Sequence, residues 1–457
     1  MNAPAAPAVA PPMPQGIHNA YLFDMFNAMS WTVVLGTPML LFLQHLRATA
    51  TILAVSASLA PLLTILQIPA ARFVERVGYR RFVMSGWTAR VVVQVGMTVV
   101  AFLPDSVDRT TRIVLMLFLS FVFCIMRGIS ACGMLPWFTH IVPEERRGEF
   151  LSRDQIGMAF AGIISLLASG LFFKGGLAWY SFGVVFSAST VAAFISLLFL
   201  RRIPDVPVQK IPSNANPLPW REMFFYPPFF KYIRYNIVIN MALGASGVFW
   251  VRFFRSFLHV SNSNTLLNSC ASTITLAGAV FLIAPVIDRT GNRQVLWLSG
   301  LFFVVHFLGW GLVAAGVLPF SLGVIAWQAL TSGCGGALWN LANVRAVMGI
   351  VPAMGRPHFL ALYSVASSLT VAIIPLLWGP VVDALEGWRM PWGFWDWNIF
   401  SIFYLVLAST IAAGFILLGA VPETKSLPWD VFMRELLVET PSRAVSRLIG
   451  RMRSPNS

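Results

Sequence analysis

One carboxylate and one guanidinium group stand out in this sequence because both lie inside long apolar runs. Asp24 is followed by Asn27 and Trp31, which share one face with it if the run is helical. Arg127 lies well inside another apolar run, 113–136. Ionisable side chains in apolar membrane segments are costly and usually face a polar path. Asp24 could carry a proton or a monovalent cation, unless it is only a solvated acid at a helix start. Arg127 could anchor an anion or pair with an acid.

Further polar and aromatic side chains occur in comparable places of other apolar runs. They are Trp137, which follows Arg127, and Asn236, Asn240, Trp339, Asn340 and Asn343 in the second half of the chain. Amide side chains could contact a solute, but they also join helices by hydrogen bonds. The three tryptophans could equally be packing or interfacial residues. Arg90, in the run 81–103, is expected to pair with a neighbour or to reach the membrane surface.

The elements that must position these groups are membrane helices. Of the 457 residues, 57% are apolar and only 11% are charged. Soluble proteins have roughly 45–50% apolar and about 25% charged residues. This composition excludes a soluble enzyme, a nucleic-acid-binding module and a disordered protein, and it predicts an all-α membrane protein. The apolar runs are continuous rather than alternating, which excludes membrane strands.

Twelve runs are long enough to cross about 30 Å of hydrocarbon as helices. They cover residues 20–43, 49–70, 81–103, 113–136, 153–173, 178–200, 230–251, 265–286, 295–316, 319–342, 359–381 and 398–420. Most of the 32 Lys and Arg residues then fall on one side, which predicts that both termini are cytoplasmic. No Asn-x-Ser/Thr acceptor occurs, which favours a bacterial inner membrane over a glycosylating route.

The chain is predicted to divide into five parts. These are a disordered lead-in (1–19), a six-helix bundle (20–200), a cytoplasmic linker (201–229), a second six-helix bundle (230–420) and a cytoplasmic tail (421–457). Arg443, Arg447 and Arg451 recur on one side of the tail, opposite apolar residues. This pattern predicts a short basic amphipathic segment suited to an anionic membrane surface.

The two predicted bundles share short motifs in the same order, which indicates an internal repeat. An acid-Arg-x-Gly-x-Arg motif follows the second and the eighth run: Glu75, Arg76, Gly78 and Arg80, then Asp288, Arg289, Gly291 and Arg293. Ser130-Ala131-Cys132-Gly133 with Trp137 recurs as Ser332-Gly333-Cys334-Gly335 with Trp339. Duplicated six-helix halves are typical of transporters, whose substrate site lies near mid-membrane between the halves.

The acid-Arg-x-Gly-x-Arg motif suits a conformational latch. Glycine permits the tight turn between two helices, and the carboxylate can pair with arginine or sit at a helix N-terminus. A contact made in one conformation and broken in another biases the equilibrium between them. The alternative is that these residues are only loop charges that set the topology.

At these residues the sequence resembles the major facilitator superfamily. That family has Gly-x-x-x-Asp-Arg-x-Gly-Arg-Arg between helices 2 and 3 and a degenerate copy between helices 8 and 9. Here Ala71 and Ala284 replace the leading glycine, Glu75 replaces the first aspartate, and Tyr79 stands where arginine is usual. The resemblance implies a fold of two pseudo-symmetric six-helix bundles. It also implies that helices 1, 4, 7 and 10 line a central cavity, and the polar candidates concentrate in these four runs.

These features predict a secondary active transporter that moves a small organic solute by alternating access, coupled to protons or a monovalent cation. An uncoupled facilitator, or a non-transporting sensor or assembly factor on the same fold, is the alternative. No phosphate-binding loop, zinc-protease motif or nucleophile-elbow motif occurs, so an enzyme is not expected. We expect no cofactor, no metal, no nucleic-acid partner and a monomer in the lipid bilayer. Cys132 and Cys334 lack partners at metal-ligand spacing.

Overall fold

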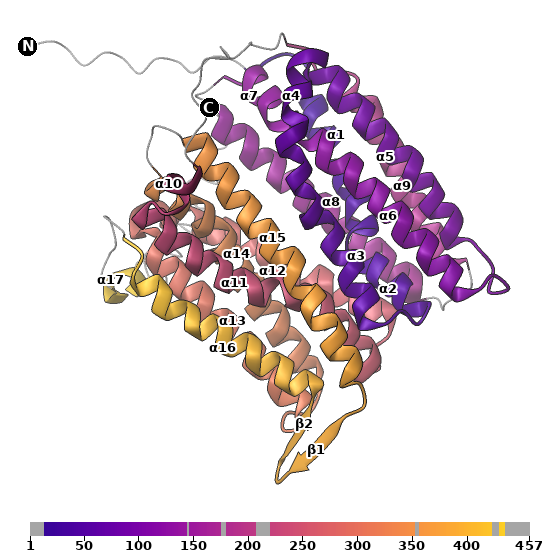
Figure 1. The fold of residues 1–457 in the computed structure, drawn as a ribbon, viewed down its shortest axis with the longest axis vertical. Helices are drawn as coiled ribbons and strands as arrows, with labels where there is room; N and C mark the ends of the chain where they lie inside the picture. The colour runs from indigo at the N-terminus through magenta and orange to yellow at the C-terminus, as the bar shows by residue number, and fades with distance from the viewer. Residues whose placement is uncertain are drawn as a thin grey trace, which may run out of the picture. The chain divides into compact units, whose positions relative to one another are not determined.

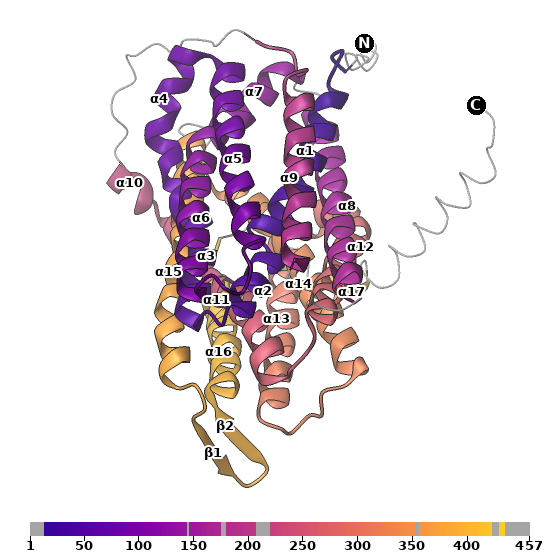
Figure 2. The ribbon, with the colours of Figure 1, turned by 90° about the vertical axis from the view of Figure 1, so that its right-hand side faces the viewer.

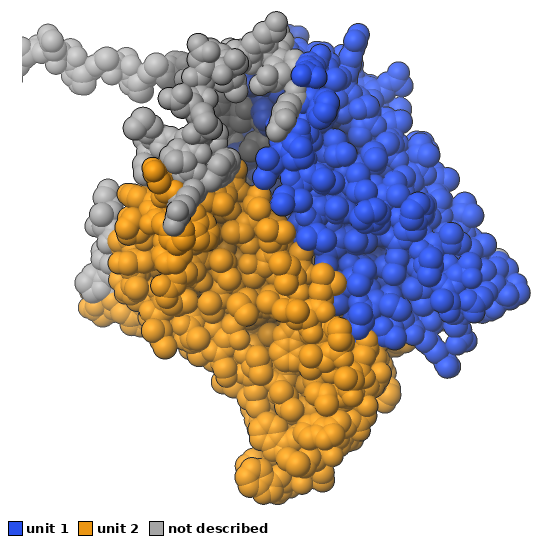
Figure 3. All heavy atoms as spheres, viewed as in Figure 1, with its two compact units in different colours: residues 1–215, 262–267 blue, residues 216–261, 268–457 orange. Residues whose placement is uncertain are grey.

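Regular structure in this protein is almost entirely helical (Figures 1 and 2). The computed structural model describes residues 13–143, 146–174, 180–206, 220–351, 356–422 and 429–434. The chain forms two compact units, which Figure 3 colours separately: unit 1 comprises residues 1–215 and 262–267, and unit 2 comprises residues 216–261 and 268–457. The predicted basic segment at Arg443, Arg447 and Arg451 lies outside the described residues.

Unit 1 contains nine α-helices and one 3-10 turn among its described residues. They are α1 (His18–Val34), α2 (Thr37–His45), α3 (Ala50–Leu62), the 3-10 turn η1 (Leu63–Leu66), α4 (Gln67–Val77), α5 (Tyr79–Ala101), α6 (Arg109–Ala131), α7 (Met134–Ile141), α8 (Arg147–Lys174) and α9 (Ser181–Leu200). Within this unit α1 packs against α8 and α9, and α5 packs against α6 and α9. These contacts join the helices that carry the candidate residues.

Unit 2 contains most of the remaining helices and one short hairpin. Its elements are α10 (Trp220–Phe224), α11 (Pro227–Arg252), the π-turn η3 (Phe253–Phe257), α12 (Asn262–Thr290), α13 (Asn292–Ala314), α14 (Leu322–Ile350), α15 (Arg356–Ala384), β1 (Arg389–Trp392), β2 (Trp395–Asn398), α16 (Ile399–Gly419) and α17 (Trp429–Arg434). The first residues of α12 cluster with unit 1. Within unit 2, α11 packs against α14, α15 and α16, and α13 packs against α14 and α16.

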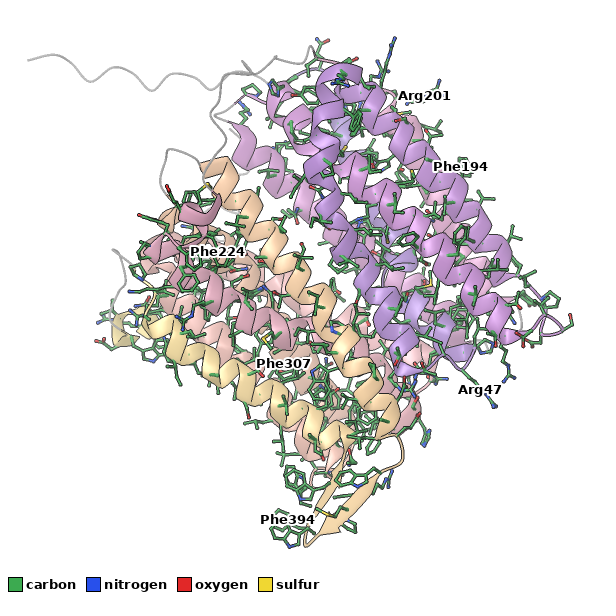
Figure 4. The ribbon with its side chains drawn as sticks, in the orientation of Figure 1. Arg47, Phe194, Arg201, Phe224, Phe307 and Phe394 are labelled. Atoms are coloured by element: carbon green, nitrogen blue, oxygen red, sulfur yellow. The ribbon has the colours of Figure 1, made fainter. Side chains whose placement is uncertain are left out.

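The helices have the length and surface of membrane spans. Ten helical segments in the described residues are long and apolar enough to cross a bilayer. The two remaining predicted spans, 265–286 and 319–342, coincide with α12 and α14, which are each 29 residues long. Large apolar side chains are exposed on these helices, including Ile416 at 80% and Phe194 of α9 at 50% (Figure 4). Exposed apolar surface of this kind suits contact with lipid, and the prediction of an all-α membrane protein is confirmed.

Three predicted spans are broken rather than straight. The first divides into α1 and α2, the second contains η1, and the fourth divides into α6 and α7. Proline accounts for these breaks because it lacks an N–H and its ring collides with the carbonyl one turn earlier. Pro38 stands at the start of α2, Pro61 precedes η1, and Pro136 lies in the first turn of α7. The repeat places Leu338 at the position of Pro136, and α14 accordingly continues through it.

The hairpin β1–β2 was not predicted from the sequence. Its strands pair antiparallel, with Met390 opposite Trp397, and Gly393 takes a φ of +62° in the turn. Phe394, at the tip in Figure 4, is 83% exposed. The hairpin connects α15 to α16 and overlaps the predicted spans only at Asn398, so no strand of the described residues crosses the membrane.

Two glycines take the same unusual backbone conformation at matching places in the two units. Gly78 joins α4 to α5 with φ +90° and ψ 151°, and Gly291 joins α12 to α13 with φ +85° and ψ 162°. This region of backbone conformation is essentially restricted to glycine. The prediction that these two glycines permit tight turns is confirmed, and the two turns have equivalent backbone conformations.

Substitution of either glycine by alanine is expected to lower stability by about 1–3 kcal/mol. Nothing lies within 4 Å of a Cβ added at Gly78, so the loss at this position measures the backbone strain alone. Gly247→Ala in α11 is a matched control, because its Cβ would also meet nothing within 4 Å in an ordinary helix. Thermal unfolding of the purified protein in detergent measures the effect. Equal melting temperatures for Gly78→Ala and Gly247→Ala would contradict it.

Candidate functional site

Two buried carboxyl groups lie near each other in unit 1. Asp24 belongs to α1 and Asp154 belongs to α8, which packs against α1. The two residues are 8% and 7% exposed, and their charges are close enough to interact. Among the described residues neither carboxyl group is part of a recorded salt bridge, and Oδ1 of Asp154 is buried without a hydrogen-bond partner. Two such groups can hold one proton or a small cation between their oxygens.

Hydrogen bonds between helices fix the position of α1 beside this pair. Ser30 of α1 donates to Oε1 of Gln94 in α5 over 3.0 Å, and Nε2 of Gln94 donates to Oγ of Ser189 in α9 over 2.7 Å. Ser189 in turn donates to the carbonyl oxygen of Ser30 over 3.0 Å. Asn27 accepts a hydrogen bond of 3.3 Å from Nε1 of Trp87. The closed ring of bonds holds α1, α5 and α9 together, so Asp24 is presented from a rigid element.

Two arginines lie beside each other on α5 and α6 of the same unit. Arg127 of α6 is half-buried, and Arg90 of α5 is 5% exposed and close enough for the two positive charges to repel. Of the two expectations for Arg90, reaching the membrane surface is wrong because the side chain is buried, whereas contact with a neighbour is found, in the form of two aromatic rings. Its guanidinium group lies between the rings of Trp87 and Phe123, 4.6 Å and 4.8 Å from their centroids.

Three of the four predicted asparagines of unit 2 form one hydrogen-bonded network with two tyrosines. Nδ2 of Asn240 donates to Oδ1 of Asn236 over 2.8 Å, and Nδ2 of Asn236 donates to Oδ1 of Asn343 over 3.0 Å. The Tyr232 hydroxyl donates to the side-chain and backbone oxygens of Asn343. Nδ2 of Asn343 donates to the Tyr363 hydroxyl over 2.6 Å. The network joins α11, α14 and α15, and its buried amides have protein partners, which suits helix packing.

The remaining candidates do not join these clusters. Trp137 is fully buried and donates from Nε1 to the carbonyl oxygen of Pro204 over 3.0 Å, and Trp339 packs against the ring of Tyr235. Trp31 is 41% exposed, and Asn340 is exposed beside the buried Asn343. The geometry of Trp137 and Trp339 is that of packing residues. Their contact with a solute, like that of Trp31 and Asn340, stays a prediction.

The second arginine of each motif binds the end of a helix in its own unit. Arg80 donates to the carbonyl oxygen of Arg201, which directly follows α9 and is labelled in Figure 4. Arg293 donates to the carbonyl oxygen of Gly419, the last residue of α16, over 3.0 Å. A cation at a helix C-terminus is stabilised by the unpaired carbonyl groups there. Both arginines therefore fasten the last long helix of their unit.

The remaining residues of the two motifs do not show whether the motif acts as a conformational latch. Arg76 is exposed, and the side chains of Glu75, Asp288 and Arg289 lie outside the described part of the structure. The hydrogen bonds of Arg80 to Arg201 and of Arg293 to Gly419 are internal to each unit, so they do not by themselves report a change between conformations. The role of the motif as a conformational gate stays a prediction.

Sequence reasoning missed Asp154 and the tyrosines. Asp154 stands one residue inside the predicted run 153–173, where it resembles a loop acid, but α8 begins at Arg147 and carries it two turns into the helix. Tyr232 and Tyr363 look like ordinary aromatic residues of apolar runs. A signal for Tyr232 was available, since it lies one turn before Asn236 on the same helical face. The described residues contain no group of three or more His, Cys, Asp or Glu that could hold a metal ion.

The described helices are apolar and long enough to span a membrane. The two units share equivalent glycine turns and arginine-bound helix ends. These features define a polytopic membrane protein with a duplicated fold, an arrangement typical of transporters. The sequence profile of the Major Facilitator Superfamily matches residues 20–342. The chain belongs to this superfamily, and it is a transporter rather than an enzyme. No curated protein matches the sequence.

Solved transporter structures share the fold at low sequence identity. A D-xylose-proton symporter has a TM-score of 0.70 and 16% identity, covering 90% of this chain and 99% of that one. A point mutant of the nucleoside transporter NupG has a TM-score of 0.69 and 13% identity, covering 90% of this chain and 100% of that one. A point mutant of the peptide transporter POT, in complex with sulfate, has a TM-score of 0.68 and 12% identity, covering 90% of this chain and 94% of that one. These likenesses establish the fold.

Proposed function

We propose that this protein is a secondary active transporter that moves a small organic solute by alternating access and couples this movement to protons. The observation that carries the proposal is the pair Asp24 and Asp154, buried within the spans of unit 1. A buried acid pair without a cationic partner is costly in a membrane span and is retained where it serves a function. A shared proton removes the repulsion between two adjacent carboxylates.

The pair suits coupling because it joins two helices of one unit. When a proton leaves, the two carboxylates repel each other, and the contact between α1 and α8 weakens. A change in this contact biases the equilibrium between conformations of the unit. Protonation thereby acts on helix packing as well as on charge. The proton symporter among the solved structures of this fold is consistent with such coupling.

The proposed arrangement in the cell follows from the charge pattern and the duplicated fold. Both termini are cytoplasmic, the protein lies in a bacterial inner membrane as a monomer, and the two units move relative to each other during transport. The proposed solute contacts are the asparagine side chains of α11 and α14 in unit 2 and the face of α1 that carries Asp24 in unit 1. This assignment includes Asn27, Asn236, Asn240 and Asn343.

Reconstitution of the full chain into liposomes tests the proposal. Labelled D-xylose, uridine, a dipeptide and benzoate represent sugars, nucleosides, peptides and organic acids. With the outside more acidic by about 2 pH units, which is roughly 2.7 kcal/mol per proton, at least one labelled solute should accumulate, and a protonophore should abolish the accumulation. A sodium gradient in place of the pH gradient distinguishes a monovalent-cation site from a proton site.

The alternatives give different results in the same vesicles. An uncoupled facilitator exchanges a labelled solute in counterflow but does not accumulate it under either gradient. A non-transporting sensor or assembly factor exchanges none of these solutes. Exchange without accumulation under either gradient would remove the coupling role from Asp24 and Asp154 and leave the fold assignment intact.

A further inference from the structure

Arg90 is an unusual residue for the interior of a membrane protein. It lies near the middle of α5, it is 5% exposed, and its Nε is buried without a hydrogen-bond partner. In the described part of the chain, its charge lies beside the rings of Trp87 and Phe123 and the cation Arg127. Among the residues that the structure describes, Arg112, Arg252 and Arg389 form salt bridges with acids, whereas Arg90 does not.

The packing of α5 against α6 brings the two arginines to the same level. A Cβ added at Gly86 of α5 would lie 2.2 Å from Cβ of Ser130 in α6, so the helices are in close contact there. Arg90 lies one turn beyond Gly86 on the same face, and Arg127 lies one turn before Ser130. The two helices run in opposite directions, so both turns lead the same way from the contact. The close approach therefore places both guanidinium groups at one level of the seam.

The electrostatics of this seam are unfavourable without an anion. A buried unpaired charge costs several kcal/mol, and two adjacent like charges add to that cost. The two aromatic faces recover only part of this cost. Arg127 is half-buried, so its guanidinium group is less enclosed than that of Arg90. A carboxylate would offset one of the two charges and a phosphate dianion both, and either group could accept forked hydrogen bonds from the guanidinium groups.

We infer that Arg90 and Arg127 form an anion-binding site for the carboxylate or phosphate group of the transported solute, with Trp87 and Phe123 as its walls. Identification of the bound anion as part of the transported solute rests on the proposed transport function. Anion binding itself does not require transport. The site lies in unit 1, and Trp87 links it to Asn27 on the helix that carries Asp24.

Ligand-dependent thermal stability of the purified full chain tests the site. The probes are benzoate, glutarate, glycerol phosphate and inorganic phosphate, in a Hepes and chloride buffer, with benzamide and glycerol as neutral counterparts. A ligand that binds only the folded protein raises its melting temperature in a saturable manner. We expect at least one anion, and neither neutral counterpart, to do so. A larger rise in melting temperature with the carboxylates or with the phosphates shows which anionic group the two arginines bind more tightly.

Arg127→Gln should weaken this binding at least tenfold, because a charge-assisted hydrogen bond contributes about 1.5–3 kcal/mol. Arg127→Lys keeps the charge but loses the fork, and its loss should be intermediate. Arg234→Gln is the matched control, since this exposed arginine also lies over a ring, that of Phe230, outside the seam. The control should bind as the unaltered protein does. Stabilisation by none of the anions, or equal stabilisation in Arg127→Gln, overturns the inference.

Arg90→Met provides a second test, because a purely structural role of Arg90 predicts a different change in melting temperature. In the buffer without the probes, its melting temperature should be higher than that of the unaltered protein, because an unpaired buried charge has been removed. Its response to the anions should be lost. A lower melting temperature together with a retained anion response overturns the inference. Failure of anion binding alongside proton-driven uptake of a neutral solute would refute this site and leave the proposed transport function standing.

Discussion

Replacement of Asp154 by asparagine is expected to abolish proton-driven accumulation while leaving solute exchange in place. A gradient of about 2 pH units supplies about 2.7 kcal/mol per proton, which sustains a concentration ratio of roughly 100 for one coupled proton. Asparagine keeps the size and hydrogen-bonding capacity of the side chain but cannot bind and release a proton. The accumulation ratio should therefore fall from up to about 100 to about 1.

The mechanism behind this expectation is the pairing of Asp154 with Asp24. Either substitution leaves one carboxyl group without its neighbour, so the repulsion that a proton normally relieves no longer exists. Asp24→Asn should thus have the same effect as Asp154→Asn, and the double variant should be no worse than either one. Such non-additivity is the sign of two groups that act as one.

Counterflow in the same vesicles separates coupling from folding. Labelled solute should still exchange against unlabelled solute in both variants, because exchange needs no net proton movement. Asp430→Asn, an exposed acid of α17, is the control and should accumulate solute normally. Full accumulation by Asp154→Asn would exclude this residue from coupling, and additive losses in the double variant would exclude a shared role.

Replacement of Asn343 by alanine is expected to cost about 2–4 kcal/mol of stability. Its side-chain oxygen accepts from Tyr232 and Asn236, and its amide donates to Tyr363. Alanine removes all three bonds at once. Each buried polar group left unsatisfied costs about 1–3 kcal/mol, and part of this loss is recovered where neighbours or water take its place.

Asn340→Ala is the matched control for this substitution. Asn340 lies on the same helix, three residues earlier, but it is exposed. Its replacement should change stability by less than about 0.5 kcal/mol. Thermal unfolding of the two purified variants measures the difference. Equal stability of Asn343→Ala and Asn340→Ala would mean that the network does not hold α11, α14 and α15 together.

The individual elements of the fold were largely predictable because they obey local rules. Apolar runs of the required length gave the membrane helices, and the two glycine turns followed from a motif in which only glycine tolerates the conformation. The breaks were harder to foresee, although Pro38 and Pro136 carry a local reason for them. The hairpin at Gly393 was missed because it is short and lies outside the apolar runs.

The candidate sites were less predictable because they depend on which helices meet. Asn236, Asn240 and Asn343 were singled out, but their tyrosine partners were not, since a tyrosine in an apolar run gives no signal of its hydrogen bond. For Arg90 the sequence predicted either contact with a neighbour or a position at the membrane surface, but it did not identify the neighbour. The neighbouring Arg127 and the two aromatic rings became apparent only when α5 met α6.

The sequence by itself determined the class of protein, its helical spans, its duplicated halves and the residues whose burial would be costly. These are properties of hydropathy, local backbone preference and charge, and each can be read within one segment. Only the tertiary structure decided that Asp24 lies beside Asp154 and that Arg90 lies beside Arg127. Both pairs join separate helices, and the face that each helix turns to its neighbour is set by side-chain packing across the whole unit.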